Sequence, residues 1–474
     1  MENKIVHVLI LYISTILWTG CNRGSSPEAY GPLPSTNQLE WQQMEYYMFV
    51  HFGPNTFTDR EWGTGREDPG VFNPTALDCR QWASTAREAG MKGIIVTAKH
   101  HDGFCLWPSQ FSSHTVRESH WKEGKGDVLE ELSRACREYD LKFGVYVSPW
   151  DRNHPAYGSA QYNDIFAGML AEVLFSYGPV FEQWFDGACG DDMAAPYDWD
   201  LFHHIVRKYQ PEAIIFSDVG PGCRWVGNER GMAGETNWSR LDTTGYSPGK
   251  NAPPVNILNS GNRHGNFWIP AEADVSIRPG WFYSPSTDSS LKTVDELMEI
   301  YLGSVGRNAN LLLNVPPDRS GRIPMGDSLR LMEFKRKRMD LFSRNIAESA
   351  RVEASSVRAG NSRRFGPQNI TDKSYDTYWT PREGKTAASF TLTLDKEETF
   401  SMILLQEYIP LGQRIARFIV EYINPSDGLW HTIAQGTTIG YKRILSFSPV
   451  TSGVIRVSIL EAGAPPLVNC VELY

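Results

Sequence analysis

GIIVTAKHH at residues 93–101 and KFGVYVSPW at residues 142–150 decide the fold of this chain. Each run is short, mostly apolar and rich in β-branched and aromatic residues, as expected of a buried parallel strand. Between them, Asp127 and Glu130 form a capping-box-like start for a helix whose apolar residues recur at helical spacing. The stretch therefore predicts a β-α-β unit.

The same alternation continues on both sides of this unit. Further strand-like runs occur at residues 46–53, 180–187, 213–220 and 310–317, with weaker ones at residues 235–238 and 280–283. Thr293 and Glu296 open another helix in the same way as Asp127 and Glu130. Eight strands that alternate with helices predict a (β/α)8 barrel. A doubly wound open sheet is the less favoured alternative, because no glycine-rich phosphate-binding motif follows the first strand.

The pattern changes after a basic, helical stretch at residues 327–345. Apolar and polar residues then alternate with period two in five segments, at residues 389–394, 401–408, 416–423, 443–450 and 453–460. Such alternation is typical of antiparallel strands with one buried face. Because a chain of 474 residues exceeds the roughly 250–300 residues that one core supports, we expect two domains. They are a barrel at residues 37–345 and an antiparallel β-sandwich at residues 346–474.

The N-terminus carries an export signal. An apolar run at residues 8–18 is too short to span a bilayer and is followed by Thr19, Gly20 and Cys21. We predict a signal peptide at residues 1–20 and a Ser/Pro/Gly-rich tether at residues 21–36, with Cys21 as the lipid-modified first residue. The protein would then be exported to the periplasm or anchored in the outer membrane through this lipid alone. A plain cleaved signal with an incidental cysteine is the alternative.

Composition argues against two classes of function. The formal net charge is −9 and no long basic run occurs, which excludes the electrostatic footprint of a nucleic-acid binder. Aromatic residues make up 12% of the chain, too many for a disordered protein. Six tryptophans fall at or near predicted strand ends, so we expect part of them to form a surface that stacks on sugar rings: Trp62, Trp107, Trp150, Trp184, Trp225 and Trp281.

Polar residues gather where the predicted strands end, and barrels keep their active sites at that end. The carboxylates are Glu61, Asp186 and Glu229, and they are accompanied by His51, His100, His101, Tyr146 and Arg224. Paired carboxylates among histidines and tryptophans suit glycoside hydrolysis. A metal site at His100 and His101 is the weaker hypothesis, because adjacent strand residues point to opposite faces. An isolated aspartate at a strand end can also be a turn cap.

Five motifs, in this order, closely resemble glycoside hydrolase family 29, the retaining α-L-fucosidases. They are MFVHFG, KHHDGF, WFDG, RWVGNE and SVGRNANLLLNVPPDRSG, and the resemblance covers residues 39–342. It implies a double-displacement mechanism without a required cofactor, in which Asp186 is the nucleophile. It further implies a fucose pocket formed by His51, His100, His101, Tyr146, Arg224 and Trp281. We add Glu61, Trp62 and Trp184 to this pocket because they lie at or near predicted strand ends.

The RWVGNE motif resembles the branch of the family that cleaves α-1,3/1,4-linked fucose from branched, Lewis-type glycans. That resemblance implies Glu229 as the acid/base, with Glu235 as the competitor. Glu272 and Asp274 are expected in a loop near the leaving-group sugar, and Arg224 is expected to stabilise the charge of Asp186. Two other hypotheses stay open: a broad α-L-fucosidase that acts on α-1,2 and aryl fucosides, and an inactive glycan-binding surface lipoprotein.

The C-terminal segment ITDKSYDTYW and the final VELY resemble discoidin-like carbohydrate-binding sandwiches. Such domains often carry a structural calcium ion, for which the resemblance suggests Asp372, Asp376, Thr377 and Glu472. A domain that only braces the barrel is the alternative. The expected partners are fucosylated oligosaccharides or glycoconjugates, and the sequence leaves the oligomeric state open.

Overall fold

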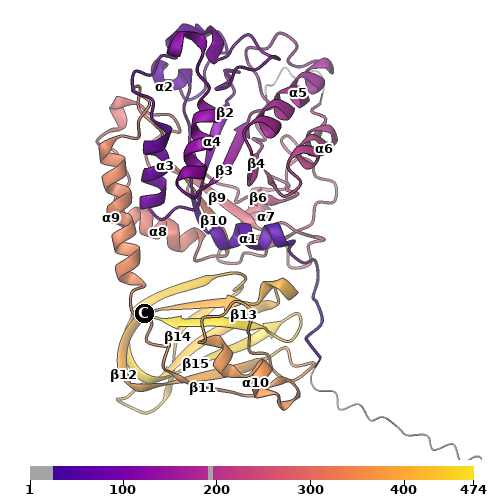
Figure 1. The fold of residues 1–474 in the computed structure, drawn as a ribbon. Coiled ribbons are helices and arrows are strands. Elements are labelled where there is room, and N and C mark those ends of the chain that lie inside the picture. The colour runs from indigo at the N-terminus through magenta and orange to yellow at the C-terminus, as the bar shows by residue number, and fades with distance from the viewer. Residues whose placement is uncertain (1–24, 190–195) are drawn as a thin grey trace, which may run out of the picture.

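The computed structural model describes residues 25–189 and 196–474. The predicted signal peptide and Cys21 lie outside these residues. The chain forms a closed barrel followed by an antiparallel sheet domain, so the predicted fold class is confirmed and the open-sheet alternative is wrong (Figure 1). Among the described helices, none has both the length and the apolar character that crossing a membrane requires.

Eight parallel strands close the barrel in the order β1-β10-β9-β6-β5-β4-β3-β2. Their carboxyl ends therefore meet at one end of the barrel, which we call the mouth. The bounds are β1 Tyr46–Val50, β2 Gly93–Lys99, β3 Lys142–Val147, β4 Glu182–Trp184, β5 Ile214–Ser217, β6 Cys223–Trp225, β9 Ala271–Ser276 and β10 Ala309–Asn314. The short strands β7 Arg240–Leu241 and β8 Phe267–Trp268 pair with each other outside the barrel.

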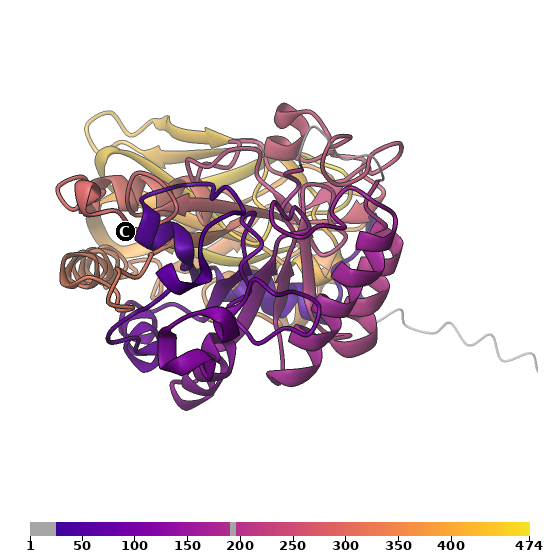
Figure 2. The same ribbon diagram turned by 90° about the horizontal axis from the view of Figure 1, so that it is seen from above.

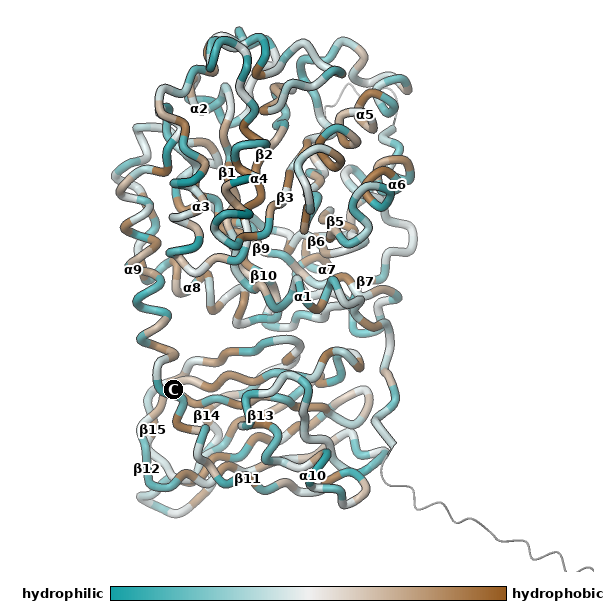
Figure 3. The backbone as a smooth tube through the Cα atoms, viewed as in Figure 1, coloured by the Kyte–Doolittle hydropathy of each residue, from teal (hydrophilic) through white to brown (hydrophobic). Residues whose placement is uncertain are grey.

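Helices surround the strands, as the view along the barrel shows (Figure 2). Both predicted caps are confirmed: Asp127 accepts the backbone N–H of Glu130 at 2.9 Å, and Thr293 and Glu296 form a capping box. Figure 3 shows strand β2 as hydrophobic and the loops of the upper rim as largely hydrophilic. The helices are α1 Thr36–Met44, α2 Pro54–Thr58, α3 Cys79–Glu88, α4 Val128–Glu138, α5 Gln161–Ser176, α6 Trp199–Tyr209, α7 Val255–Ser260, α8 Val294–Ser304, α9 Met325–Leu341 and α10 Ser362–Phe365.

The two weak strand predictions were wrong. Residues 235–238 and 280–283 form no barrel strand, and β6 and β9 take these places in the closed sheet. Strand β9 has the sequence AEADVS, in which Glu272 and Asp274 are buried. An apolar pattern could not reveal a strand whose buried side chains include two carboxyl groups.

The second domain, which we call the sandwich, consists of β11 Arg351–Ala354, β12 Ala388–Glu407, β13 Ile415–Ile423, β14 Trp430–Gly436, β15 Arg443–Ala462 and β16 Val468–Leu473. Strands β12 and β15 pair along most of their lengths, with shifts of register between Thr393 and Glu398 and between Phe400 and Met402. Each therefore unites two of the five segments expected from the period-two pattern. The core is apolar and includes Trp379, Phe390 and Phe418.

The sandwich packs against the amino-terminal ends of the barrel strands. Asn308, which precedes β10, accepts the N–H of Tyr441 at 2.7 Å through its side chain and donates its own N–H to the carbonyl of Lys442. Lys442 forms an ion pair with Glu45, the residue before β1. Gln413 is fully buried in the same interface. The sandwich thus closes the end of the barrel that lies opposite the mouth (Figure 1).

Residues 25–35, which we call the strap, run along the sandwich before the chain enters α1. Arg358 donates to the carbonyl of Ser25 at 2.9 Å, and Arg414 donates to the carbonyl of Glu28. Tyr30 donates its N–H to a carbonyl of the sandwich at 3.1 Å. The part of the predicted tether that follows residue 24 is therefore fixed to the folded body.

Candidate active site

Asp186 lies at the mouth of the barrel, two residues after β4 ends. Its Oδ1 accepts the N–H of Ala188 at 2.7 Å, and its Oδ2 accepts the hydroxyl of Tyr146 at 3.1 Å. The Nε2 atom of His101 lies 3.5 Å from the same Oδ2. The side chain keeps 28% of its surface exposed, so a ligand at the mouth can reach the carboxylate.

Three predicted histidines lie together beside this carboxylate. The ring centroids of His51 and His100 are 5.5 Å apart, and those of His100 and His101 are 4.2 Å apart. Because β2 ends at Lys99, strand alternation no longer applies and both histidines face the site, contrary to the sequence-based argument. Burial lowers the pKa of His51 to about 3 and that of His101 to about 4, and it lowers the pKa of His100 well below its ordinary value. The imidazoles are neutral and can both donate and accept hydrogen bonds.

Two polar side chains orient the histidines. Asn314 Oδ1 lies 2.9 Å from Nδ1 of His51, and its Nδ2 donates to the carbonyl of Trp281 at 2.8 Å. Ser148 Oγ lies 2.8 Å from Nδ1 of His101. Neither Asn314 nor Ser148 was predicted as a site residue, although each lies inside a motif quoted from the sequence. Within the described residues, Nδ1 of His100 is buried and has no hydrogen-bond partner.

Glu229 stands on the loop after β6, at the rim of the mouth. Partial burial raises the pKa of its carboxyl group, and the nearby charge of Asp186 raises it further, against a hydrogen bond from Trp281. Burial likewise raises the pKa of Glu61, which accepts the backbone N–H of Trp281. Glu61, Trp62, Glu229 and Trp281 line one cavity of about 480 Å³. The structure thus brings together a carboxyl group with a raised pKa, Glu229, and an accessible carboxylate, Asp186.

Aromatic side chains form the walls of the mouth. Trp62 is 56% exposed, and its ring centroid lies 5.8 Å from that of Trp150. The ring centroid of Trp281 lies 5.0 Å from that of His51, with an interplanar angle of 32°. Flat apolar rings beside hydrogen-bonding imidazoles suit a sugar, which has apolar C–H faces and polar hydroxyls.

Two other tryptophans are buried. Trp184 stacks on Phe216 at a centroid distance of 4.0 Å inside the barrel and supports Tyr146 from a distance of 5.1 Å. Trp107 is only 2% exposed and donates its indole N–H to Glu172 at 3.0 Å. The prediction that Trp107 belongs to a sugar-stacking surface was wrong, because a position near a strand end does not determine the direction of the side chain.

Arg224 is fully buried and does not face Asp186. Its guanidinium donates to two backbone carbonyls and, at 2.8 Å, to Asn237. Cys223 points into the barrel interior, so the next residue of the same strand points outward. The prediction that Arg224 lines the pocket and stabilises the charge of Asp186 was wrong.

Glu235 lies at the opposite end of the barrel from Asp186. Its exposed carboxylate is 3.7 Å from Arg307, and its backbone carbonyl accepts hydrogen bonds from Thr437 and Arg443 of the sandwich. A group at this end cannot exchange a proton with a ligand at the mouth. Glu235 as the competing acid/base is therefore wrong.

Glu272 and Asp274 are not loop residues, contrary to expectation. Asp274 accepts the indole N–H of Trp225 at 2.8 Å, and burial together with the charge of Glu229 raises its pKa well above the ordinary value. Trp225 is thus fixed between the barrel interior and the loop of Glu229.

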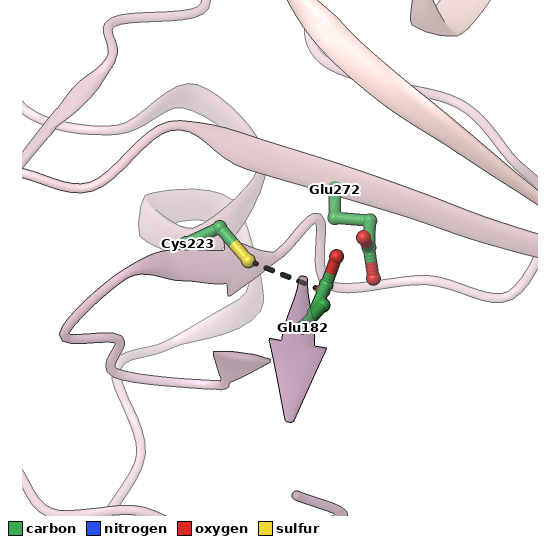
Figure 4. A group of neighbouring side chains, drawn as sticks. All are labelled: Glu182, Cys223 and Glu272. Atoms are coloured by element: carbon green, nitrogen blue, oxygen red, sulfur yellow. Dashed lines mark hydrogen bonds between the residues drawn. The ribbon is translucent and has the colours of Figure 1, made fainter. Parts of the chain in front are cut away.

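Glu272 belongs to a buried cluster inside the barrel with Glu182 and Cys223 (Figure 4). Among the described residues, this is the one group of at least three His, Cys, Asp or Glu side chains whose ligand atoms lie within 4.8 Å of one another. Every carboxyl oxygen already accepts a hydrogen bond, from Cys223, Trp41, Trp184 or Tyr47. Burial raises the pKa of Glu182 to about 7 and that of Glu272 well above its ordinary value. The raised pKa values favour a protonated carboxyl group in this pair, and each of its oxygens already accepts a hydrogen bond.

The predicted calcium ligands of the sandwich do not converge. Thr377 donates to Asp372 at 2.6 Å, and Glu472 accepts the hydroxyl of Tyr474 at 2.6 Å. The carboxylates of Asp372, Asp376 and Glu472 do not all lie within 4.8 Å of one another. The calcium site at these residues therefore stays a prediction.

An accessible carboxylate and a second carboxyl group with a raised pKa are the two groups that hydrolysis of a glycosidic bond requires. At the mouth of a (β/α)8 barrel walled by tryptophan and histidine, they define a glycoside hydrolase. Sequence comparison is more specific. The α-L-fucosidase family model matches residues 29–336, and the F5/8 type C domain model matches residues 351–473. The chain belongs to the α-L-fucosidase family, glycoside hydrolase family 29.

Individual relatives agree with this assignment. α-L-Fucosidase 1 of Arabidopsis thaliana is 43% identical over 94% of this chain and 87% of its own length. A solved structure named as an α-L-fucosidase from Bacteroides thetaiotaomicron has a TM-score of 0.89 at 39% identity, covering 95% of this chain and 99% of the other. A Ruminococcus gnavus GH29 fucosidase in complex with fucose has a TM-score of 0.87 at 33% identity, covering 95% and 97%. The predictions of an α-L-fucosidase and of a discoidin-like second domain are confirmed.

Proposed function

We propose that this protein is a retaining exo-α-L-fucosidase in which Asp186 is the nucleophile and Glu229 the acid/base. The observation that supports this most is the contrast between the two carboxyl groups. Asp186 is an accessible carboxylate that accepts hydrogen bonds from Tyr146 and Ala188, whereas burial and the charge of Asp186 raise the pKa of Glu229 and so favour its protonated form.

The reaction proceeds in two displacements. A carboxylate oxygen of Asp186 attacks the anomeric carbon of fucose while the glycosidic bond breaks and Glu229 gives its proton to the departing oxygen. The resulting ester links fucose to Asp186. Glu229 then takes a proton from water, whose oxygen attacks the same carbon and releases Asp186. Two inversions leave the configuration unchanged.

Neutral imidazoles suit an uncharged substrate. His51, His100 and His101 offer donors and acceptors to sugar hydroxyls without introducing a charge that would need a counter-ion. Trp281, beside His51, offers an aromatic face to the apolar side of the ring. We propose that these residues hold the fucosyl group of fucosylated oligosaccharides or glycoconjugates.

For the linkage, we propose α-1,3/1,4-linked fucose in branched, Lewis-type glycans. The support is the RWVGNE motif around Glu229 and the cavity beside it, whose walls include the exposed Trp62. A rim of this kind can accept a second sugar branch. A broader fucosidase that prefers α-1,2 or aryl fucosides is the second candidate.

Three measurements test these proposals. Asp186→Asn should abolish hydrolysis of an aryl fucoside, and near-normal turnover by this variant would reject the nucleophile assignment. NMR of the first fucose released should show the α-anomer.

Comparing rates on a Lewis-type trisaccharide, an α-1,2-linked fucoside and an aryl fucoside tests the linkage proposal. Preference for the α-1,2-linked or the aryl fucoside rejects it. Fucose release from the trisaccharide also dismisses an inactive glycan-binding protein.

We further propose that the protein is an exported lipoprotein modified at Cys21. The support is the apolar run at residues 8–18 with small residues before the cysteine. Mass spectrometry of the N-terminal peptide, isolated from membranes of the producing cell, should find a diacylglyceryl group on Cys21. An unmodified N-terminus elsewhere in residues 19–25 would reject lipidation.

A further inference from the structure

The start of the strap restricts where a lipid on Cys21 can lie. Only three residues separate Cys21 from Ser25. Since a chain gains at most about 3.6 Å per residue, a lipid on Cys21 would hold the membrane surface near the part of the folded body that contains Ser25.

That part is an end of the sandwich, and the strap is firmly held there. Arg358 is only 5% exposed and Arg414 only 1%, and each donates to a carbonyl of the strap. If the strap lifted away, both buried guanidinium groups would lose these acceptors, which is costly for a charged group. The position of Ser25 is thus as fixed as the sandwich itself.

The surface beside Ser25 carries positive charge. Arg364 of α10 donates to Ser26 at 2.6 Å, and the loop that contains Arg382 and Lys385 is tied to the same region by the bond from Arg382 N–H to Ser356. We call the exposed residues of this surface the basic patch: Arg363, Arg364, Arg382 and Lys385. Glu383 is an acidic side chain beside it and lies 3.6 Å from Arg358. The patch is locally basic on a chain whose net charge is −9.

This end of the molecule lies far from the mouth of the barrel. The sandwich contacts the barrel through residues that precede β1 and β10, whereas Asp186 follows the carboxyl end of β4. Figure 1 shows α10 on the lower side of the sandwich, away from the barrel. The strap start and the basic patch therefore lie at one end of the molecule, and the mouth lies at the other.

We infer that the sandwich end formed by the strap start and the basic patch is laid against an anionic membrane surface, so that the mouth of the barrel faces away from the membrane. The inference rests on the proposed lipidation of Cys21 and is independent of the linkage specificity. The lipid supplies the attachment, and the basic side chains select the orientation, since lysine and arginine are attracted to anionic headgroups at close range. Glycans would then approach the active site from the medium.

The first experiment separates the patch from the lipid. The mature full chain with Cys21→Ser is mixed with vesicles of phosphatidylcholine, with and without 30% phosphatidylglycerol. We expect binding only to the anionic vesicles, weakening as salt is added. The variant R363E/R364E/R382E/K385E should bind more than about tenfold more weakly. Equal binding by this variant and its parent would overturn the inference.

A matched control reverses four exposed basic residues on the flank of the barrel, R80E/K122E/K125E/R134E. It should bind anionic vesicles like the parent, apart from a small loss from net charge. A loss as large as that of the patch variant would mean that net charge, not the patch, drives binding, which also overturns the inference. Melting temperature and hydrolysis of an aryl fucoside confirm that both variants are folded, and these readouts test the active site separately.

The second experiment measures orientation. The lipidated full chain is bound to the anionic vesicles, and hydrogen exchange is compared with that of the free protein. We expect protection at residues 362–365 and 382–385 and unchanged exchange at residues 59–63 and 279–282. Protection at the mouth loops instead, or no protection around α10, would overturn the inference even if the enzyme hydrolyses fucosides normally.

Discussion

At the scale of single residues, the two carboxyl groups of the site differ in their surroundings rather than in their chemistry. Asp186 accepts hydrogen bonds on both oxygens, whereas Glu229 stands at the rim in partial burial with the charge of Asp186 nearby. The raised pKa of Glu229 favours its protonated form, so this group can give a proton to the leaving oxygen while Asp186 attacks.

Replacing Glu229 by Gln should therefore slow hydrolysis most for substrates with a poor leaving group. We expect kcat/KM to fall by about 10²–10⁴-fold for a fucosylated oligosaccharide and much less for a nitrophenyl fucoside. The alkaline limb of the pH profile should disappear, because the raised pKa of Glu229 sets it. Azide should restore activity to Glu229→Ala. Glu235→Gln, at the other end of the barrel, is the control and should behave as wild type.

Asn314 is a positioning residue because it holds His51 and the Trp281 carbonyl at once. Asn314→Leu keeps the volume and removes the hydrogen bonds to His51, to Ser276 and to the Trp281 carbonyl. We expect KM for an aryl fucoside to rise up to about tenfold, as one lost hydrogen bond allows, with a smaller change in kcat. Asn310→Leu, four residues earlier on β10 and bonded to the Trp41 carbonyl, should reduce stability without changing KM. Equal KM effects of the two variants would contradict the assignment.

At the scale of elements, sequence alone predicted most of the barrel and part of the site. Continuous apolar runs identified strands such as β2 and β3, and the polar residues after them identified His101 and Asp186. The prediction for Arg224 was wrong because its place at a strand end shows where the residue lies but not the face to which its side chain points. Strand β9 was not predicted because its buried carboxyl groups accept hydrogen bonds from residues distant in the sequence, such as Trp184. No local sequence pattern reveals these partners.

The buried pair of Glu182 and Glu272 should make stability depend on pH. Burial raises both pKa values, Glu182 to about 7, so the folded state holds a proton that the unfolded chain releases above about pH 4.5. More protons bound in the folded state mean that the free energy of unfolding falls as pH rises from about 5 to 8. Glu272→Gln should flatten this fall in urea unfolding curves at pH 5, 6.5 and 8.

Glu299→Gln is the matched control, because Glu299 is exposed on α8. It should leave the pH dependence of unfolding unchanged. If Glu272→Gln and Glu299→Gln show the same slope, the buried pair does not hold the additional proton.

At the scale of the whole molecule, we expect the barrel and the sandwich to unfold together, because buried polar contacts join them. Gln413 of the sandwich is buried, accepts the N–H of Ser239 at 2.7 Å and donates to the carbonyl of Asn237 at 3.1 Å. Gln413→Leu leaves the buried N–H of Ser239 without this acceptor, whereas the Asn237 carbonyl still accepts a hydrogen bond from Asn308. We expect a loss of about 1–3 kcal/mol in the free energy of unfolding, with a single transition retained and KM unchanged.

Gln435→Leu, at an exposed position of the edge strand β14, is the control for this change and should cost little. Calorimetry distinguishes the outcomes. Two separated transitions in Gln413→Leu would show that the barrel and the sandwich melt independently, which contradicts a common folding unit.

The strap also affects the order in which the chain can fold. Ser25 is bonded to Arg358, which lies 333 residues further along the chain. In the proposed export the N-terminal segment is the first to cross the membrane, yet the surface that receives the strap exists only after the last domain has formed. We expect the strap to dock as the final step of folding, so that the proposed signal cleavage site is open to processing enzymes until the rest of the molecule is complete.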